Sequence, residues 1–192
     1  MFKRILVPTD GSIRAEHAAR AAIELAKYLN ASIVSLYVYP PFHVVVTEPF
    51  VNMPDLVSEP AYKKVQRTAA KRILGVIDQA AHAAGVPCFS LCVEHDSPAA
   101  AIVETAVSPE TPCDLVFIGS HGRGLFSQVF LGSVTTKVQT LCDVPVLVYR
   151  DPQEKKVKAE KDNTKKPAAG KKATKSATGK EAKKSAAKSA KK

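Results

Sequence analysis

Short apolar runs alternate with amphipathic stretches along the first 150 residues of the chain. The apolar runs cover residues 5–7, 33–38, 88–93, 114–118 and 144–149, and most of them are rich in valine, isoleucine and leucine. Runs of this length between turn residues predict strands. Pro145 lies inside the last run and favours an edge position for that strand, because proline cannot donate a sheet hydrogen bond.

The stretches between these runs carry apolar residues three and four positions apart, which predicts helices beginning near residues 13, 58, 98 and 133. Asp10 and Ser12 are both candidates for the first N-cap, Gly85 fits the position after the second helix, and Ser97 followed by Pro98 fits the start of the third. The apolar face expected for the second helix is formed by Val65, Ala69, Ile73, Val76, Ile77 and Ala80.

Strands that alternate with helices and are apolar along their length predict a parallel sheet covered by helices on both faces. The fold class is therefore α/β, a doubly wound five-stranded sheet. Such a sheet binds ligands beyond the carboxyl ends of neighbouring strands, at the point where the strand order reverses. Periodicity alone does not give that order. Residues 40–58 form a long apolar and proline-rich connection, which is typical of a lid or a contact surface.

Charge divides the chain into two parts. The 192 residues contain 28 Lys+Arg and 18 Asp+Glu, for a formal net charge of +10. Residues 1–150 contain 13 of each sign, whereas residues 151–192 contain 15 Lys and five acids. We therefore expect one globular domain over residues 1–150. The tail over residues 151–192 is expected to be disordered, because Val157 is its only large aliphatic residue and it has no aromatic residue.

Several classes of protein are excluded at this stage. The amino-terminal apolar run is too short for a signal peptide, and no segment is long and apolar enough to span a membrane. The cysteines, Cys88, Cys92, Cys113 and Cys142, form no CxxC pair and have no histidine at ligand spacing. We interpret all four as small buried hydrophobic residues of a cytoplasmic protein, and we predict no metal site.

Two loops are candidates for binding chemistry. One follows the first strand and contains Asp10. The other follows the fourth strand and contains Gly119, Gly122 and Gly132, with Ser133 opening a helix. Glycines allow a phosphate to approach backbone N–H groups, and a helix N-terminus attracts an anion. The alternative is that these glycines only form turns and a helix cap. The pattern is neither the dinucleotide GxGxxG nor a P-loop.

The spacing Gly119-x-x-Gly122, nine residues, Gly132-Ser133 resembles the nucleotide-binding signature of the universal stress protein family. The resemblance extends over residues 2–150 and includes the opening ILVPTDGS and the closing VPVLV. It implies an ATP-binding member with strand order 3-2-1-4-5. It also implies a homodimer that pairs through the last strand, from Val144 to Tyr149.

The resemblance also implies roles for individual residues. Asp10 and the backbone of Val38 would contact the adenine end, and Gly119 would lie against the ribose. The phosphates would be held at the second loop, with Mg²⁺ bridging their oxygens. The full set of expected ligand-binding residues is Pro8, Thr9, Asp10, Val38, Gly119, Ser120, Gly122, Arg123, Gly132, Ser133 and Val134.

Nucleotide binding does not by itself imply turnover. Hydrolysis needs a residue that positions water, and Asp10 or His121 is a candidate, but nothing in the sequence marks either as a catalytic base. We therefore expect a nucleotide sensor of the stress response with no assigned catalytic residue. A slow ATPase is one alternative. Another is a nucleic-acid-associated structural protein that uses the domain only for dimerisation.

The tail resembles, in composition, the carboxyl-terminal tails of linker histones and of histone-like bacterial proteins. Lysines separated by Ala, Ser and Thr form a flexible polycation, which predicts salt-sensitive binding to DNA or RNA and an association with the nucleoid. The alternatives are a solubility tail and an anchor to another polyanion. A second basic feature, Lys63, Lys64, Arg67, Lys71 and Arg72 on the second helix, is by default a solvated helix face.

Overall fold

The computed structural model describes residues 2–43, 58–122 and 131–151. The chain divides into two compact units, residues 1–154 and residues 155–192, and all described residues belong to the first unit. The expectation of a disordered tail and most of the long connection after residue 40 lie outside the described residues, as does Arg123.

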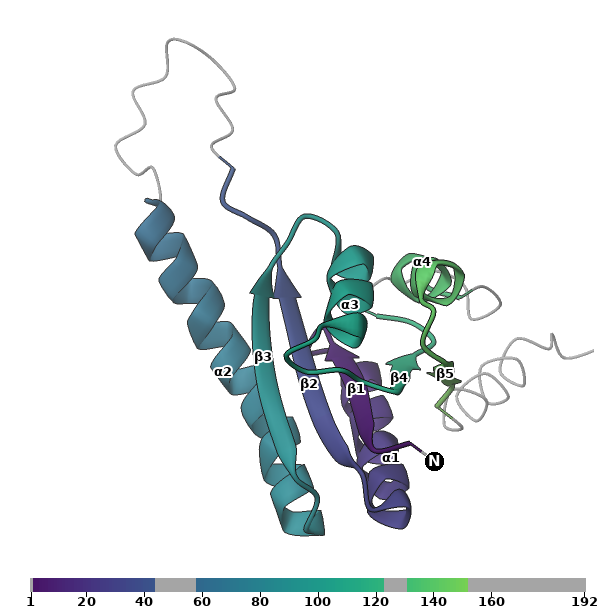
Figure 1. Ribbon diagram of the computed structural model, residues 1–192. Helices are drawn as coiled ribbons and strands as arrows, with labels where there is room; N and C mark the ends of the chain where they lie inside the picture. Colours follow the sequence, from purple (N-terminus) through teal and green to yellow (C-terminus); the bar gives the residue numbers. More distant parts are fainter. Residues whose placement is uncertain (1, 44–57, 123–130, 152–192) are drawn as a thin grey trace, which may run out of the picture. The chain divides into compact units, whose positions relative to one another are not determined.

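Five strands and four helices alternate along the described part of the chain (Figure 1). Every strand pairing is parallel and the sheet order is β3-β2-β1-β4-β5, which confirms the predicted fold class and strand order. The elements are β1 (Arg4–Thr9), α1 (Ile13–Leu29), β2 (Ser32–Tyr39), α2 (Glu59–Ala84), β3 (Cys88–Glu94), α3 (Pro98–Val107), β4 (Leu115–Gly119), α4 (Ser133–Leu141) and β5 (Val146–Tyr149).

Local capping explains where the helices begin and end. Ser12, not Asp10, is the N-cap of α1, and its Oγ accepts a hydrogen bond from the Ala15 N–H at 3.2 Å. Gly85 ends α2 with a φ of +72°, a left-handed conformation that glycine adopts without steric cost. The side chain of Ser97 caps α3 at the residue before Pro98, as predicted.

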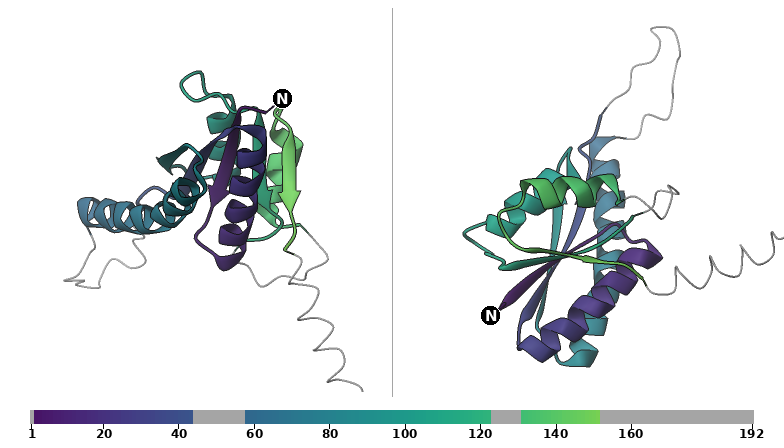
Figure 2. Two further views of the ribbon diagram at one scale, coloured as in Figure 1. Left: turned by 90° about the horizontal axis from the view of Figure 1, so that it is seen from below. Right: turned by 90° about the vertical axis from the view of Figure 1, so that its right-hand side faces the viewer.

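The helices cover the sheet in two layers, visible on either side of the strands in Figure 2. Buried residues of α1 and α2, including Ala22 and Ile77, pack with Ile5 and Phe117 on one face. On the other face α3 and α4 pack on β1, β2 and β4 through a second apolar cluster that includes Ile102 and Val138. The central strands β1 and β4 are therefore buried between two helical layers.

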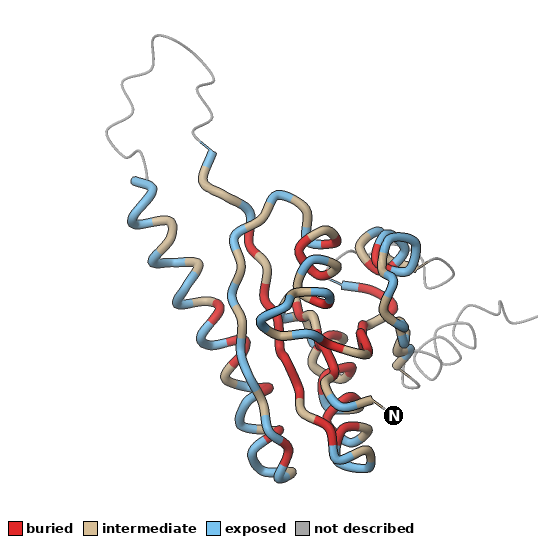
Figure 3. Tube along the Cα trace, viewed as in Figure 1, coloured by how far each residue is buried: buried red, intermediate tan, exposed pale blue. Residues whose placement is uncertain are grey.

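The edge strand β3 departs from the prediction that all strands are buried on both faces. Its residues are either partly buried or exposed, as the tan and pale blue of β3 in Figure 3 show. Phe89 is 56% exposed. The prediction of four buried cysteines is wrong for the same reason: Cys92 on β3 is exposed and Cys88 is only partly buried. Cys113 is buried, and Cys142 is partly buried.

The apolar face of α2 also differs from the expected one. Val65 is 64% exposed and Val76 is 40% exposed. The buried residues of α2 are Ala70, Ile73, Leu74, Ile77 and Ala81, so full burial of its apolar face begins only after the third turn. Within the residues that the structure describes, none of the helices is long and apolar enough to cross a membrane.

Candidate functional site

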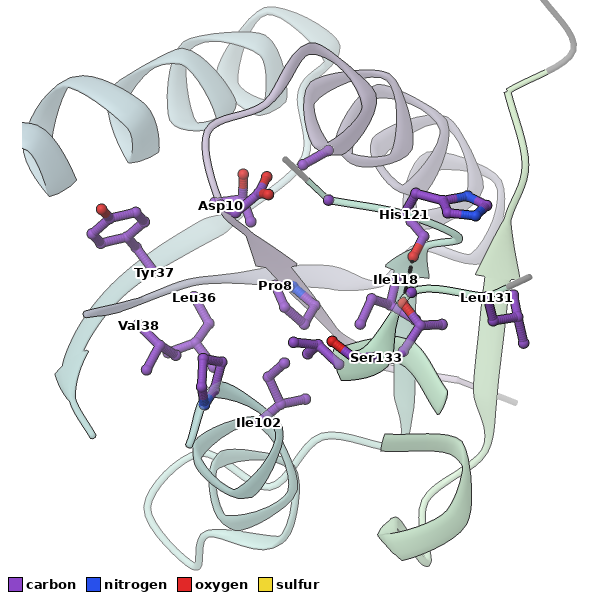
Figure 4. A pocket seen from close by; sticks show the side chains of 18 of the residues that line it. Pro8, Asp10, Leu36, Tyr37, Val38, Ile102, Ile118, His121, Leu131 and Ser133 are labelled. Atoms are coloured by element: carbon purple, nitrogen blue, oxygen red, sulfur yellow. Dashed lines mark hydrogen bonds between the residues drawn. The ribbon is translucent and has the colours of Figure 1, made fainter. Parts of the chain in front are cut away.

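A cavity of about 750 Å³ lies at the carboxyl ends of the strands, where β1 and β4 are neighbours (Figure 4). The strand order reverses at this pair, because the chain passes from β1 outward to β2 and β3 and then returns to β4. The loops after β1 and β4 therefore meet at one edge of the sheet. Nine of the predicted ligand-binding residues line this cavity: Pro8, Thr9, Asp10, Val38, Gly119, Gly122, Gly132, Ser133 and Val134.

The two other predicted residues do not line the cavity in the described structure. Ser120 is buried and supports the loop after β4. Its carbonyl accepts a hydrogen bond from the Gly132 N–H, and its own N–H donates to the Tyr149 carbonyl, both at 2.8 Å. Arg123 lies outside the described residues. Ser120 is thus placed to shape the site from behind its wall.

The loop after β1 holds the Asp10 carboxylate in place. The Ser12 N–H donates to Asp10 Oδ1 at 3.0 Å, and the Gly11 N–H donates to Thr9 Oγ1 at 3.1 Å. Gly11 has a φ of +77°, which allows this tight turn. The sequence TDGS therefore presents to the cavity a carboxylate that a backbone N–H holds in place.

The loop after β4 returns to the start of α4 at Gly132. Thr135 Oγ1 donates to the Gly119 carbonyl at 2.8 Å, which links the first turn of α4 to the end of β4. A Cβ atom on Gly132 would lie 3.3 Å from the Ser120 carbonyl oxygen and 3.4 Å from His121 Cα. These are backbone atoms that cannot easily move, so the close packing of the loop requires glycine here.

The N-terminus of α4 is open to a ligand. Gly132 is the N-cap and therefore supplies no side-chain cap. The N–H groups of the first helical turn point out of the helix end and carry its positive dipole charge. Ser133 and Val134 line the cavity from this turn. An anionic group in the cavity would find backbone donors and a hydroxyl there.

The opposite end of the cavity is apolar. In Figure 4, Leu36, Val38 and Ile102 lie on one side of Pro8, while Ile118 and Ser133 lie on the other. The apolar end suits a flat, hydrophobic group, and the α4 end suits an anion. A molecule with both features would occupy the cavity lengthwise.

Sequence reasoning missed about half of the cavity wall. His121 is buried within the loop after β4, and its Nδ1 lies 3.1 Å from Ser120 Oγ. The remaining missed residues come from α1, β2, α3, β4, α4 and the loops at Pro40 and Leu131: Ala15, Leu36, Tyr37, Pro40, Pro98, Ile102, Ile118, Leu131 and Thr135. Only the position of His121 beside the glycines could have indicated such a role from the sequence.

The described residues offer no protein-only metal site. Within residues 2–43, 58–122 and 131–151, no group of three or more His, Cys, Asp or Glu side chains is arranged to hold a metal ion. A divalent cation in the cavity would need ligands from the bound molecule itself, as Mg²⁺ commonly obtains from phosphate oxygens.

The chain is similar in sequence to universal stress proteins. The model of the universal stress protein family matches residues 1–150. A universal stress protein of Methanocaldococcus jannaschii is 30% identical over 154 residues, covering 80% of this chain and 85% of that protein. One from Thermus aquaticus is 31% identical over 150 residues, covering 78% of this chain and all of that protein.

Solved structures share the same fold. The hypothetical protein MJ0577, solved as a test case of structural genomics, is similar with a TM-score of 0.64 and 27% identity, over 79% of this chain and 97% of that one. A universal stress protein in complex with cAMP is similar with a TM-score of 0.54 and 22% identity, over 78% and 97%. One from Archaeoglobus fulgidus in complex with dAMP has a TM-score of 0.51 and 19% identity, over 77% and 98%.

Proposed function

The chain belongs to the universal stress protein family, and from that premise we propose that its cavity binds ATP and that the protein acts as a nucleotide sensor. The observation that carries the proposal is the pairing, in one cavity, of an apolar end with an uncapped helix N-terminus. Adenine is a flat ring with apolar faces and a polar edge, and the polyphosphate is anionic. The two ends of the cavity therefore match the two ends of the nucleotide.

The proposed contacts follow from this orientation. The adenine ring lies against the apolar end, with the backbone of Val38 and the Asp10 carboxylate at its polar edge. Gly119 lies beside the ribose. The phosphates lie at Gly122, Gly132, Ser133 and Val134, where the Ser133 and Val134 N–H groups of the first turn of α4 have no partner within the helix. Pro8, Thr9, Ser120 and Arg123 complete the proposed site, and Mg²⁺ bridges the phosphate oxygens.

The proposal of ATP specifies a triphosphate, and the support for that choice comes from this chain. The two structures that contain cAMP and dAMP are less than 25% identical to this chain, so they show the fold alone. The support for ATP comes from this chain, in which glycines stand at both ends of the loop that leads to α4. A nucleotide with one phosphate would contact fewer of the N–H groups at the α4 end than ATP would.

We propose a binding role with little turnover. The described wall has one carboxylate, that of Asp10, and it already accepts the Ser12 N–H. Hydrolysis would require a group that orients water against the terminal phosphate. A slow ATPase is the competing proposal, and multiple-turnover phosphate release that Asp10→Ala abolishes would favour it.

The decisive experiment uses the full chain. The purified protein is denatured, and the released small molecules are identified by chromatography and mass; the emptied, refolded protein is then titrated calorimetrically with ATP, ADP and cAMP, with and without Mg²⁺. We expect ATP to bind most tightly and Mg²⁺ to strengthen it. If the denatured protein releases no nucleotide and the refolded protein binds none, the proposal is overturned. Tighter binding of cAMP than of ATP would overturn the assignment of the α4 end to a polyphosphate.

We also propose a homodimer that pairs through β5. This strand hydrogen-bonds to β4 and forms one edge of the sheet, and the Leu147 side chain is 38% exposed on it. An apolar edge strand invites pairing with a second chain. Light scattering of the wild type and Leu147→Asp tests this: we expect a dimer that becomes a folded monomer, whereas a monomeric wild type would contradict it.

A second function is proposed for the tail, on the observation that residues 151–192 hold 15 of the 28 basic residues and a net charge of +10. We propose that it tethers a cytoplasmic protein to nucleic acid, and so to the nucleoid. Binding of a DNA duplex by the full chain and by a chain ending at residue 154 is the test. The tail has no such role if both bind equally at every salt concentration.

A further inference from the structure

Helix α2 carries a dense group of cations that nucleotide binding does not use. Residues 63–72 contain Lys63, Lys64, Arg67, Lys71 and Arg72 and no acid. The rest of residues 1–150 has eight basic and 13 acidic residues. A domain of zero net charge therefore concentrates positive charge on one helix. We refer to Lys64, Arg67, Lys71 and Arg72 as the α2 basic stripe.

The stripe is exposed and its charges are not neutralised by the described residues. All four residues are exposed, and within the described part of the chain none of them forms an ion pair. Two cations near acidic residues on the same helices are paired: Arg20 binds Glu16 at 2.8 Å on α1, and Lys63 binds Glu59 at 2.7 Å at the start of α2. The stripe is thus not an ordinary mixed-charge helix face.

Like charges within the stripe repel one another. Arg67 and Lys71 are four residues apart, a spacing at which like charges destabilise a helix. A bound polyanion would remove this repulsion.

A groove lies beside the stripe. It has a volume of about 550 Å³, lies between α2 and the edge strand β3, and has Arg67 and Lys71 among its lining residues. Gly75 also lines it and borders open space, since a Cβ atom there would meet nothing within 4 Å. The other lining residues are Ala70, Leu74 and the acidic Asp78 on α2, and Ser90 and Cys92 on β3. Arg67 and Lys71 can therefore contact a ligand that lies across the helix and also a group of that ligand that enters the groove.

We propose that the α2 basic stripe binds the phosphate backbone of a DNA duplex, at a surface separate from the nucleotide cavity and from the tail. From Lys64 to Arg72 the helix rises about 12 Å. A duplex presents roughly seven phosphate charges over that length, one per ~1.7 Å of its axis. The stripe has four positive charges over the same length, so several of its cations can contact phosphates at once.

The other candidate occupants fit less well. The tail has the same sign of charge as the stripe, so the two repel each other. An acidic protein would need apolar or aromatic anchors at the centre of its interface, and Val65 is the only large apolar residue between Lys64 and Arg72. A phosphate backbone needs only accessible cations.

The test compares two variants of the full chain with equal loss of charge. The stripe variant is Lys64→Gln, Arg67→Gln, Lys71→Gln and Arg72→Gln together. The control replaces four exposed cations elsewhere: Lys3→Gln, Arg20→Gln, Lys27→Gln and Lys137→Gln. Each binds a random-sequence DNA duplex across a series of salt concentrations, and circular dichroism checks folding. We expect the log–log salt slope to fall by about 2–4 in the stripe variant only, since each phosphate contact contributes about 0.9.

Equal slopes in the two variants would overturn the proposal. A second measurement does not depend on the stripe variant folding: lysine acylation of the wild type with and without the duplex, read by mass spectrometry. We expect Lys64 and Lys71 to be protected and Lys27 and Lys137 to remain reactive. Unprotected Lys64 and Lys71 would overturn the proposal. Stronger protection by polyglutamate than by the duplex would overturn it in favour of an acidic protein partner.

Discussion

The Asp10 carboxylate occupies the space that a side chain on Gly122 would need. A Cβ atom at position 122 would lie 2.6 Å from Asp10 Oδ2 and 3.5 Å from its Cγ. Asp10 is held on its other oxygen, Oδ1, by the Ser12 N–H. The loop after β1 and the loop after β4 therefore fit together at these two positions, because the Asp10 carboxylate fits only against a residue without a side chain at position 122.

This relationship predicts a non-additive pair of substitutions. Gly122→Ala should displace the Asp10 carboxylate and weaken ATP binding about tenfold, the value of one hydrogen bond to a charged group. In an Asp10→Ala background there is no carboxylate to displace, so Gly122→Ala should change the affinity by no more than about twofold. Calorimetric titration of the four proteins measures the coupling. If Gly122→Ala lowers the affinity equally in the wild type and in the Asp10→Ala background, it does not act by displacing the Asp10 carboxylate.

A second prediction concerns Gly132. Gly132→Val places branched carbons against the backbone of Ser120 and His121, so it should abolish detectable ATP binding and lower the free energy of unfolding by about 1–3 kcal/mol. Gly75→Val is the matched control, because a Cβ atom at Gly75 meets no neighbour within 4 Å. It should leave ATP affinity unchanged and alter stability by less than about 1 kcal/mol. Normal affinity in a folded Gly132→Val protein would contradict the assignment of the α4 end to phosphates.

A third prediction concerns a contact behind the apolar end of the cavity. The Tyr62 hydroxyl on α2 donates to the carbonyl of Pro40 at 2.8 Å, and Pro40 lines the cavity. The Tyr62 ring also packs against Phe42, with 5.5 Å between ring centroids. Tyr62→Phe keeps this ring contact but frees Pro40, so ATP affinity should fall about twofold to fivefold.

Tyr28→Phe is the control for Tyr62→Phe, because Tyr28 lies on α1 and is 85% exposed. Its affinity for ATP should equal that of the wild type. An effect of the same size in both variants would show that α2 does not position the wall of the cavity.

A fourth prediction concerns alkaline pH. Burial raises the pKa of the Cys113 thiol from 9.0 to about 11, the Asp114 carboxylate adds to this, and Arg4 opposes it. The folded state therefore retains a proton that the unfolded state loses. The free energy of unfolding should be constant with respect to this group below pH 9 and fall, by about 2 kcal/mol, as the pH rises to about 11.

Urea unfolding of the wild type and Cys113→Ala across this range provides the measurement. The variant should lose less stability than the wild type between pH 9 and 11. It should still lose some, because burial also raises the pKa values of Tyr39 and Tyr149. Parallel stability curves for the two proteins would show that Cys113 does not titrate as its burial requires.

Local features of the fold could be predicted from the sequence with good accuracy. Helix α4 begins at Ser133, as predicted, and Gly85 ends α2 as expected. These features depend on neighbours within a few residues, where capping and periodicity act. The strand order could not be obtained in this way. It came from the resemblance of the glycine spacing to a family, because hydrophobic periodicity is the same for any order of parallel strands.

The sequence by itself determined the alternation of strands and helices, the separation of a neutral domain from a basic tail, and the glycine loop after the fourth strand. Only the tertiary structure decided which residues share a cavity and which strand remains exposed. Ile102 of α3 reaches the site and Cys92 of β3 faces solvent because parallel strands are paired by long-range contacts between residues far apart in the chain. A local pattern states that a side chain is apolar or polar, but the element that covers it is set by packing across the whole sheet.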